Sequence, residues 1–266
     1  MDRTTAVGLA AGLLALIGGF LLEGGHLEGL VEYTALLIVF GGTFAAVTVS
    51  FPWTKLRGIP DALRFAFRLE TRHPAELVDQ LVEMATVARR EGVLALERQA
   101  LDHPDPFLRS GLLMVVDGTD PELTRQIMEL EMDAAEQHRQ QQAAIFEAAG
   151  GYAPTMGIIG TVMGLIHVLG NLEDPGALGP SIAVAFTATL YGVASANILY
   201  LPLAMKIKSR QEEQALVLEM LVEGVLAVQA GHNPQLIRKK LSSYLPFQPE
   251  SPRSRGERED ADAAQA

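Results

Sequence analysis

Small and hydroxyl-bearing side chains recur at helical spacing in two long apolar stretches of the chain. In "YAPTMGIIGTVMGLI", residues 152–166, one narrow stripe of an α-helix contains Gly157, Thr161 and Gly164. A later stretch has the same kind of stripe, made of Ala185, Thr189, Gly192 and Ala196. Hydroxyl oxygens suit a hard cation, and small residues let helices approach backbone to backbone. The stripes therefore predict either tight helix packing or a hydrated, ion-conducting contact with another helix.

Other polar residues in these stretches are weaker evidence for an ion pathway. Thr187 points away from the stripe of Thr189, so we expect its hydroxyl to bond to its own helix. His167 is a lone histidine near one end of its stretch, which is typical of a packed or interfacial residue. Ion relays within membranes normally use ionisable groups, and these stretches hold no Asp, Glu, Lys or Arg. If the protein moves ions, a second polypeptide should supply the carboxylate.

Stretches of this length and composition predict membrane-spanning helices. The chain has 266 residues, 48% of them hydrophobic, with a net charge of -11. A helix needs about 20 apolar residues to cross a bilayer. Four such helices are predicted, near 4-22, 33-52, 153-172 and 181-205. The expected fold class is therefore all-α: a polytopic membrane protein with four transmembrane helices and a helical cytoplasmic domain.

Lys and Arg residues near the ends of the spans predict their orientation, because cytoplasmic flanks carry the excess of these residues. The second and fourth spans are followed by Lys55, Arg57, Arg64, Arg68, Lys206, Lys208 and Arg210. The connections around 23–32 and 173–174 contain none. Both termini are therefore predicted on the cytoplasmic side of the membrane.

This orientation gives an expected division of the chain. Residues 1–54 hold spans one and two, 55–150 form a cytoplasmic helical domain, 151–205 hold spans three and four, 206–245 extend the last helix, and 246–266 form a disordered tail.

Within the cytoplasmic part, residues 75–101 and 121–149 are rich in Ala, Leu, Glu, Gln and Arg at helical spacing, which predicts helices. Arg90 lies seven residues before Glu97 and would therefore lie on nearly the same helical face. "KLRGIPDALRFAF", residues 55–67, predicts an amphipathic helix that lies along the membrane or packs on neighbouring protein.

Four motifs, in this order, resemble the MotA family of flagellar stator proteins, including its sodium-type members PomA and MotP. They are "ARREGVLALE", "GLLMVVDGTDPE", "YAPTMGIIGTVMGLI" and "AVAFTATLYGVASAN", and the resemblance extends from about residue 5 to 235. It implies a non-enzymatic machine part, a homopentamer around a dimer of a MotB-like partner. That partner has one membrane span with an essential Asp and a cell-wall-binding domain. Ion flow past the Asp would turn the ring and drive the rotor protein FliG.

The resemblance also implies roles for particular residues. Pro154 and Pro202 match two prolines at the cytoplasmic ends of spans three and four that couple ion flow to conformational change. Arg89 and Glu97 match a charged pair that contacts the rotor, and Arg90 could share or replace the role of Arg89. Taken alone, the prolines could equally be helix-end signals, and the charges could form an ordinary solvated face.

The ion pathway is expected to be lined by Thr161, Thr189, Gly157, Gly164, Ala185 and Gly192. The transported ion is expected to be Na+ or H+, with no cofactor and no resident metal. Thr161 and the "TLYG" at 189–192 favour sodium. Ala188 departs from that pattern, because sodium-type members often have a threonine there.

Four other classes of protein fit the sequence less well. An ExbB- or TolQ-like energiser of outer-membrane processes is the main alternative, although those proteins look three-spanned with an external amino terminus. A secondary transporter would need broken spans in paired halves, which the sequence does not show. No phosphate-binding loop, metal cluster or nucleophile motif indicates an enzyme, and the acidic balance argues against nucleic acid.

Overall fold

The computed structural model describes residues 3–67, 73–170 and 175–245, and all regular secondary structure in these ranges is helical. The all-α expectation is therefore confirmed. Contacts divide the chain into two units, Met1–Thr71 with Leu130–Ala215, and Arg72–Glu129 with Leu216–Ala266. The tail predicted to be disordered, 246–266, and the connection at 173–174 lie outside the described residues.

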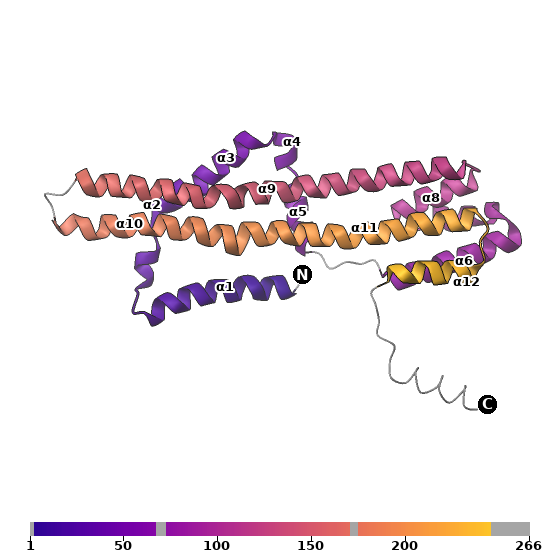
Figure 1. Ribbon diagram of the computed structural model, residues 1–266, viewed down its shortest axis with the longest axis horizontal. Coiled ribbons are helices and arrows are strands. Elements are labelled where there is room, and N and C mark those ends of the chain that lie inside the picture. Colours follow the sequence, from indigo (N-terminus) through magenta and orange to yellow (C-terminus); the bar gives the residue numbers. More distant parts are fainter. Residues whose placement is uncertain (1–2, 68–72, 171–174, 246–266) are drawn as a thin grey trace, which may run out of the picture. The chain divides into compact units, whose positions relative to one another are not determined.

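The first unit contains the apolar helices (Figure 1). The first is α1 (Arg3–Leu22), which is followed by the 3-10 turn η1 (Leu27–Leu30). The second is a continuous run of α2 (Tyr33–Leu36), the π-helical η2 (Leu37–Gly41) and α3 (Gly42–Ser50). The third is the C-terminal part of α9 (Pro121–Gly170). The fourth comprises α10 (Pro175–Ala194), the π-helical η4 (Ser195–Tyr200) and the start of α11 (Leu201–Gln229).

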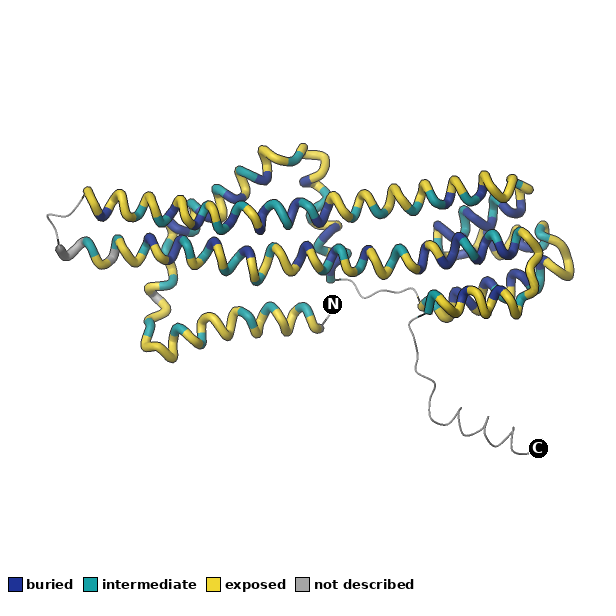
Figure 2. The backbone as a smooth tube through the Cα atoms, viewed as in Figure 1, coloured by how far each residue is buried: buried dark blue, intermediate teal, exposed yellow. Residues whose placement is uncertain are grey.

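The surfaces of these helices are suited to lipid. The described residues include four helices long and apolar enough to cross a membrane, which confirms the predicted spans. None of the described residues of Thr4–Leu22 is buried, and Leu14 and Leu22 are 70% and 92% exposed. Figure 2 shows exposed and half-buried positions along the whole of α1. An apolar surface of this extent is stable when it faces hydrocarbon rather than water.

Glycine brings the backbones of α9 and α10 into contact. A Cβ on Gly192 would lie 2.5 Å from the carbonyl oxygen of Ala153, and a Cβ on Gly157 would lie 2.9 Å from that of Ala188. Both distances are too short for non-bonded atoms, and a backbone carbonyl cannot rotate aside as a side chain can. The close approach of the two helices therefore requires glycine at positions 157 and 192.

Pro154 and Pro202 lie within helical runs and do not end them. Pro154 is inside α9, and Pro202 is the second residue of α11, directly after η4. Proline lacks the N–H that would bond to the carbonyl one turn earlier, and wide π turns are a common local adjustment in such helices. The helix-end interpretation of both prolines is wrong, because each helix continues on both sides. Their coupling role stays a prediction.

The segment after the second span packs onto other helices of the first unit. It forms α4 (Trp53–Leu56) and α5 (Ile59–Phe67). Ala62 and Ala66 are fully buried in a cluster that includes Phe146 of α9. The structure thus favours the packed alternative for this amphipathic segment.

An ion pair holds α5 on α9. Arg139 donates to the carboxylate of Asp61 at 2.6 Å, and Gln142 donates to the same oxygen at 3.1 Å. These two hydrogen bonds lower the pKa of Asp61 below its usual value, the contribution of Gln142 being the larger. The guanidinium of Arg139 also lies 4.1 Å from the ring centre of Phe65. The contacts fix the register of α5 along α9.

The second unit is a separate helical bundle. It contains α6 (Pro74–Glu91), η3 (Val93–Leu96), α7 (Glu97–Leu101), α8 (Pro106–Val116), α12 (Pro234–Leu241) and η5 (Ser242–Tyr244), with the start of α9 and the end of α11. Its largest fully buried side chains include Leu81, Leu108, Leu112, Met128 and Leu221. Asp105 caps α8, since its carboxylate accepts from the N–H groups of Phe107 and Leu108.

Gly192→Ala is expected to destabilise the protein, because the new Cβ would force α10 away from Ala153. Overpacking of this kind costs about 1–3 kcal/mol, so the thermal unfolding midpoint in detergent should fall by several degrees. Gly151→Ala is the matched control, since a Cβ there has nothing within 4 Å. Equal midpoints for the two variants would show that α9 and α10 are not in backbone contact.

Candidate functional site

Thr161 of α9 and Thr189 of α10 share a hydrogen bond between their hydroxyl groups. The Oγ1 of Thr161 also lies 2.8 Å from the carbonyl oxygen of Ala185 and 3.1 Å from that of Gly157. A hydroxyl has one proton, so Thr161 can donate to only one of these acceptors at a time. The result is a cluster of four neutral oxygen atoms between two apolar helices, defined here as the oxygen cluster.

The predicted stripes face each other within one chain. A Cβ on Gly164 would lie 2.8 Å from the Cβ of Ala185, and Ala185 and Gly192 are buried in the α9–α10 contact. The expectation of tight helix packing is thus confirmed. The role of Gly157, Thr161, Gly164, Ala185, Thr189 and Gly192 in an ion pathway stays a prediction. Thr161 and Thr189 are half-buried, so the oxygen cluster is not sealed inside this chain.

Two neighbouring positions in α10 are explained by the structure. The hydroxyl of Thr187 donates to the carbonyl of Ala183 at 2.9 Å, which confirms that it bonds to its own helix. Ala188 is buried against Ala35 and Val39 of the second apolar helix. A side chain at position 188 therefore points into that helix contact, which explains why a small residue fits there.

Tyr191 is a structural contact that the sequence analysis missed. Its hydroxyl donates to the carbonyl of Leu30 and accepts from the N–H of Glu32 at 3.2 Å, and its ring lies 6.4 Å from that of Phe40. These bonds tie α10 to the turn before α2. A tyrosine within an apolar span could have indicated this contact, because a phenol hydroxyl removed from water normally needs a polar partner.

Arg90 and Glu97 lie on different helices, contrary to the sequence-based expectation. α6 ends at Glu91, Gly92 adopts a φ of 88°, and Glu97 is the first residue of α7. The prediction that Arg90 and Glu97 share one face of a continuous helix is wrong, because Gly92 breaks it. A positive φ is readily adopted by glycine and costs other residues energy.

Arg89, Arg90 and Glu97 are all exposed. Across residues 3–67, 73–170 and 175–245, none of the ion pairs involves any of the three. Arg89 and Arg90 occupy the last turn of α6, and Glu97 the first turn of α7, which suits each helix dipole. By contrast, the exposed Arg98 lies 4.0 Å from Asp102. The three charges are thus available to another molecule.

Two protein-family models match the chain. Residues 99–220 match the MotA/TolQ/ExbB proton channel family, and residues 6–92 match the motility protein A N-terminal model. Together these regions include the oxygen cluster, nearly all of the four spans, and Arg89 and Arg90, whereas Glu97 lies between the two matched regions.

Named relatives agree with the family models. Motility protein A of Bacillus subtilis is 40% identical over 92% of this chain and 92% of its own length. Chemotaxis protein PomA of Vibrio alginolyticus is 36% identical over 92% of this chain and 96% of its own.

A solved structure shares the fold as well as the sequence. The flagellar MotAB stator complex from Bacillus subtilis contains a chain that matches with a TM-score of 0.87 and 39% identity, over 92% of this chain and 96% of that one. Identity above 30% across nearly the whole length is not explained by fold alone. The chain belongs to the MotA/TolQ/ExbB proton channel family, in its motility protein A branch.

Proposed function

We propose that this chain, a flagellar motor stator subunit, forms a pathway for Na+ or H+ together with a MotB-like partner and converts ion flow into torque on the rotor protein FliG. The observation that carries the proposal is the oxygen cluster, which lies between spans that contain no Asp, Glu, Lys or Arg. The ExbB- or TolQ-like alternative is not favoured, because the named relatives are motility protein A and PomA. In this proposal the chain is a mechanical component of the motor and catalyses no chemical reaction.

The partner is needed because the oxygen cluster is neutral. A cation that leaves water for a low-dielectric site requires a counter-charge as well as oxygen ligands. A carboxylate on a single span of the partner, placed beside Thr161 and Thr189, would provide it. The similar Bacillus subtilis structure is a MotAB complex, which supports a partner of this kind. The cluster favours Na+ because hydroxyl and carbonyl oxygens suit a hard cation.

Assembly as a homopentamer around the partner span would place several copies of the oxygen cluster around one axis. The orientation in this proposal has both termini in the cytoplasm, because Lys55, Arg57, Lys206 and Lys208 follow the spans at the same side. Pro154 and Pro202 would then act as pivots, since each lies within a helix where one backbone hydrogen bond is missing.

Torque would reach the rotor through Arg89, Arg90 and Glu97. These side chains are exposed on the second unit and have no ion-pair partner among the described residues. Charges of both signs at one helix break can engage complementary charges on FliG, and such contacts are long-ranged and reversible.

Thr161→Val with Thr189→Val is expected to reduce ion-driven rotation strongly, because valine keeps the volume and removes both hydroxyl oxygens. Thr187→Val is the matched control, since that hydroxyl bonds only within its own helix. Swimming speed at graded external Na+ is the measurement. Loss of speed in the control but not in the double variant would place the pathway elsewhere. Speed that ignores Na+ and collapses with a protonophore would identify H+ as the ion.

Gly164→Leu is expected to prevent association with the MotB-like partner. The leucine side chain would collide with Ala185 and separate α9 from α10. The measurement is co-purification of the partner with the tagged chain from membranes. Gly170→Leu controls for bulk in the same helix, since nothing lies within 4 Å of a Cβ at that position. Full co-purification and motility of the Gly164 variant would contradict the close-packed arrangement.

Reversal of Arg89 and Arg90 to Glu is expected to lower torque without affecting insertion, because both side chains are exposed. Torque is measured by the rotation of tethered cells, and insertion by the amount of protein in membranes. Arg98→Glu is the control, as Arg98 is an exposed cation that already lies near Asp102. Unchanged torque in the double variant would remove these residues from the rotor contact.

A further inference from the structure

A cavity of about 680 Å³ lies between α9 and α11, in the part of the first unit beyond the predicted spans. Apart from Ala144, every residue that lines it has a charged or amide side chain. The lining includes three acids, two of the amides and one lysine that matter here: Glu136, Glu147, Glu212, Gln140, Gln211 and Lys208. A volume of this size is typical of a site for a small molecule.

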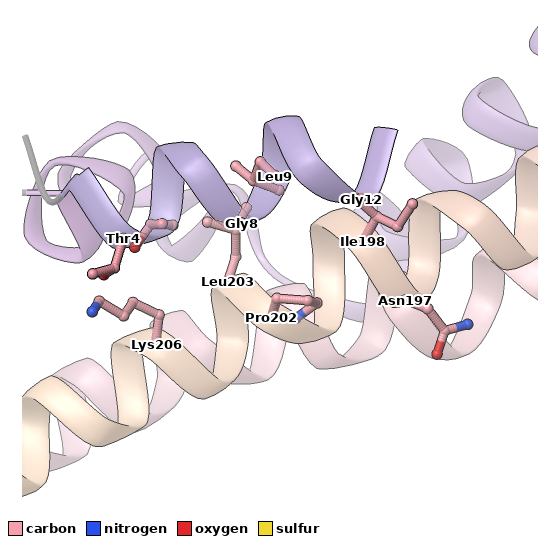
Figure 3. Close-up of a pocket in the computed structure, with 10 residues that line it drawn as sticks. Thr4, Gly8, Leu9, Gly12, Asn197, Ile198, Pro202, Leu203 and Lys206 are labelled. Carbon is pink, nitrogen blue, oxygen red and sulfur yellow. The ribbon is translucent and has the colours of Figure 1, made fainter. Parts of the chain in front are cut away.

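A second cavity of the first unit has a different character. It has a volume of about 390 Å³ and lies between α1 and the segment formed by η4 and the start of α11 (Figure 3). Leu9, Ile198 and Leu203 contribute apolar walls, and none of its described lining residues carries a carboxylate. The acids therefore distinguish the cavity between α9 and α11, because a negatively charged wall attracts a cation.

One ion pair inside the α9–α11 cavity is already complete. The ammonium group of Lys208 donates to the carboxylate of Glu147 at 2.5 Å. Glu136 accepts from the neutral amide of Gln140 at 2.9 Å, which leaves its negative charge uncompensated. Within the part of the chain that the structure describes, neither Glu136 nor Glu212 forms an ion pair. The cavity therefore has an excess of negative charge, with one such carboxylate on each helix.

Gln211 adds a buried polar group to the wall of this cavity. It is only 7% exposed, and its side-chain amide forms no hydrogen bond with any residue that the structure describes. Buried amides are normally hydrogen-bonded, because the loss of water without a replacement partner costs free energy. The Oε1 atom of Gln211 can accept a hydrogen bond from a molecule in the cavity. Gln211 thus indicates a donor that the described chain does not itself provide.

The two uncompensated carboxylates lie at different levels of the helix pair. Because Lys208 pairs with Glu147, these two positions share one level of the antiparallel helices α9 and α11 (Figure 1). By helix rise, Glu212 lies about 6 Å beyond that level and Glu136 about 16 Å beyond it, so they are about 10 Å apart along the axis. A linear ligand with a cation at each end matches this spacing. A metal ion does not, since no group of three or more His, Asp or Glu among the described residues could hold one.

We propose that this cavity binds a linear polyamine, with its terminal ammonium groups at Glu136 and Glu212 and an amine N–H donated to Gln211. Ammonium groups donate to carboxylate and amide oxygens, as Lys208 already does to Glu147 in the same cavity. The flexible chain between the ammonium groups can follow the groove between the two helices. The ligand would join α9 to α11, and the site is independent of the ion pathway and of the rotor contact.

Isothermal titration calorimetry of the purified full-length chain with spermidine tests the ligand class. One spermidine should bind per chain. A derivative acetylated at both terminal amines should bind much more weakly, because it lacks the charges that face the two carboxylates. Mg²⁺ at equal ionic strength should not displace spermidine, since it screens the acids but cannot bridge their spacing. Equal binding of the acetylated derivative, or full displacement by Mg²⁺, would overturn the proposal.

Two double variants locate the terminal ammonium groups. Glu136→Gln with Glu212→Gln should weaken spermidine binding about ten-fold, the loss that corresponds to two partly exposed ion pairs. Glu131→Gln with Glu213→Gln is the matched control, because both glutamates are exposed on the same two helices and neither lines the cavity. The control removes the same net charge and should bind like the unaltered chain. Equal affinity of the two double variants would show that spermidine responds only to overall charge.

Gln211→Leu tests the buried amide, because leucine fills a similar volume and has no acceptor. Spermidine affinity should fall about five-fold, the factor that corresponds to one hydrogen bond. Gln214→Leu, on the same helix but outside the cavity, should not change it. Circular dichroism of both variants verifies that the helices are intact. Unchanged affinity in a folded Gln211→Leu chain would contradict the assignment of this amide to the site.

Discussion

Backbone contact between α9 and α10 is the constraint on which the candidate site depends. Lipid offers no hydrophobic drive for helices to associate, so dispersion contacts and short interhelical hydrogen bonds must hold them together. Gly157 and Gly192 permit this contact, because a Cβ at either position would collide with a carbonyl oxygen. The same approach brings the hydroxyls of Thr161 and Thr189 within hydrogen-bonding distance. Wider helix spacing would leave two isolated hydroxyl groups in place of one cluster.

The polar side chains of the third and fourth spans fall into two sets. Thr187 and Asn197 bond to carbonyls of their own helix, which satisfies them locally. Thr161, Thr189 and Tyr191 bond across helices and fix how α10 sits against α9 and the turn before α2. The second set is the one that can respond to a bound ion or a partner span, because a change in helix spacing alters its hydrogen bonds. Tyr191 thus links α10, the helix that carries Thr189, to the connection between the first two spans.

Much of this arrangement could be predicted from the sequence. Uncharged runs predicted the four spans, and helical periodicity predicted both small-residue stripes and the local bond of Thr187. Periodicity gives the face of a helix but not its partner, so the contact of the two stripes with each other could not be derived. Gly92 was missed as a helix break, since an isolated glycine is tolerated within helices. The continuation of helices through Pro154 and Pro202 depends on tertiary support, which no local pattern encodes.

The π-helical turn η4 bears on how relatives of this chain are aligned. A turn with i→i+5 bonding contains one residue more than an α turn, and one residue corresponds to about 100° of rotation about the axis. In this chain, η4 separates Thr189 from Pro202 and Lys206. A homologue with a regular α-helix there would need a one-residue gap. Without that gap, the alignment would pair Thr189 with a side chain pointing in a different direction. It would then wrongly indicate that the homologue lacks the hydroxyl group.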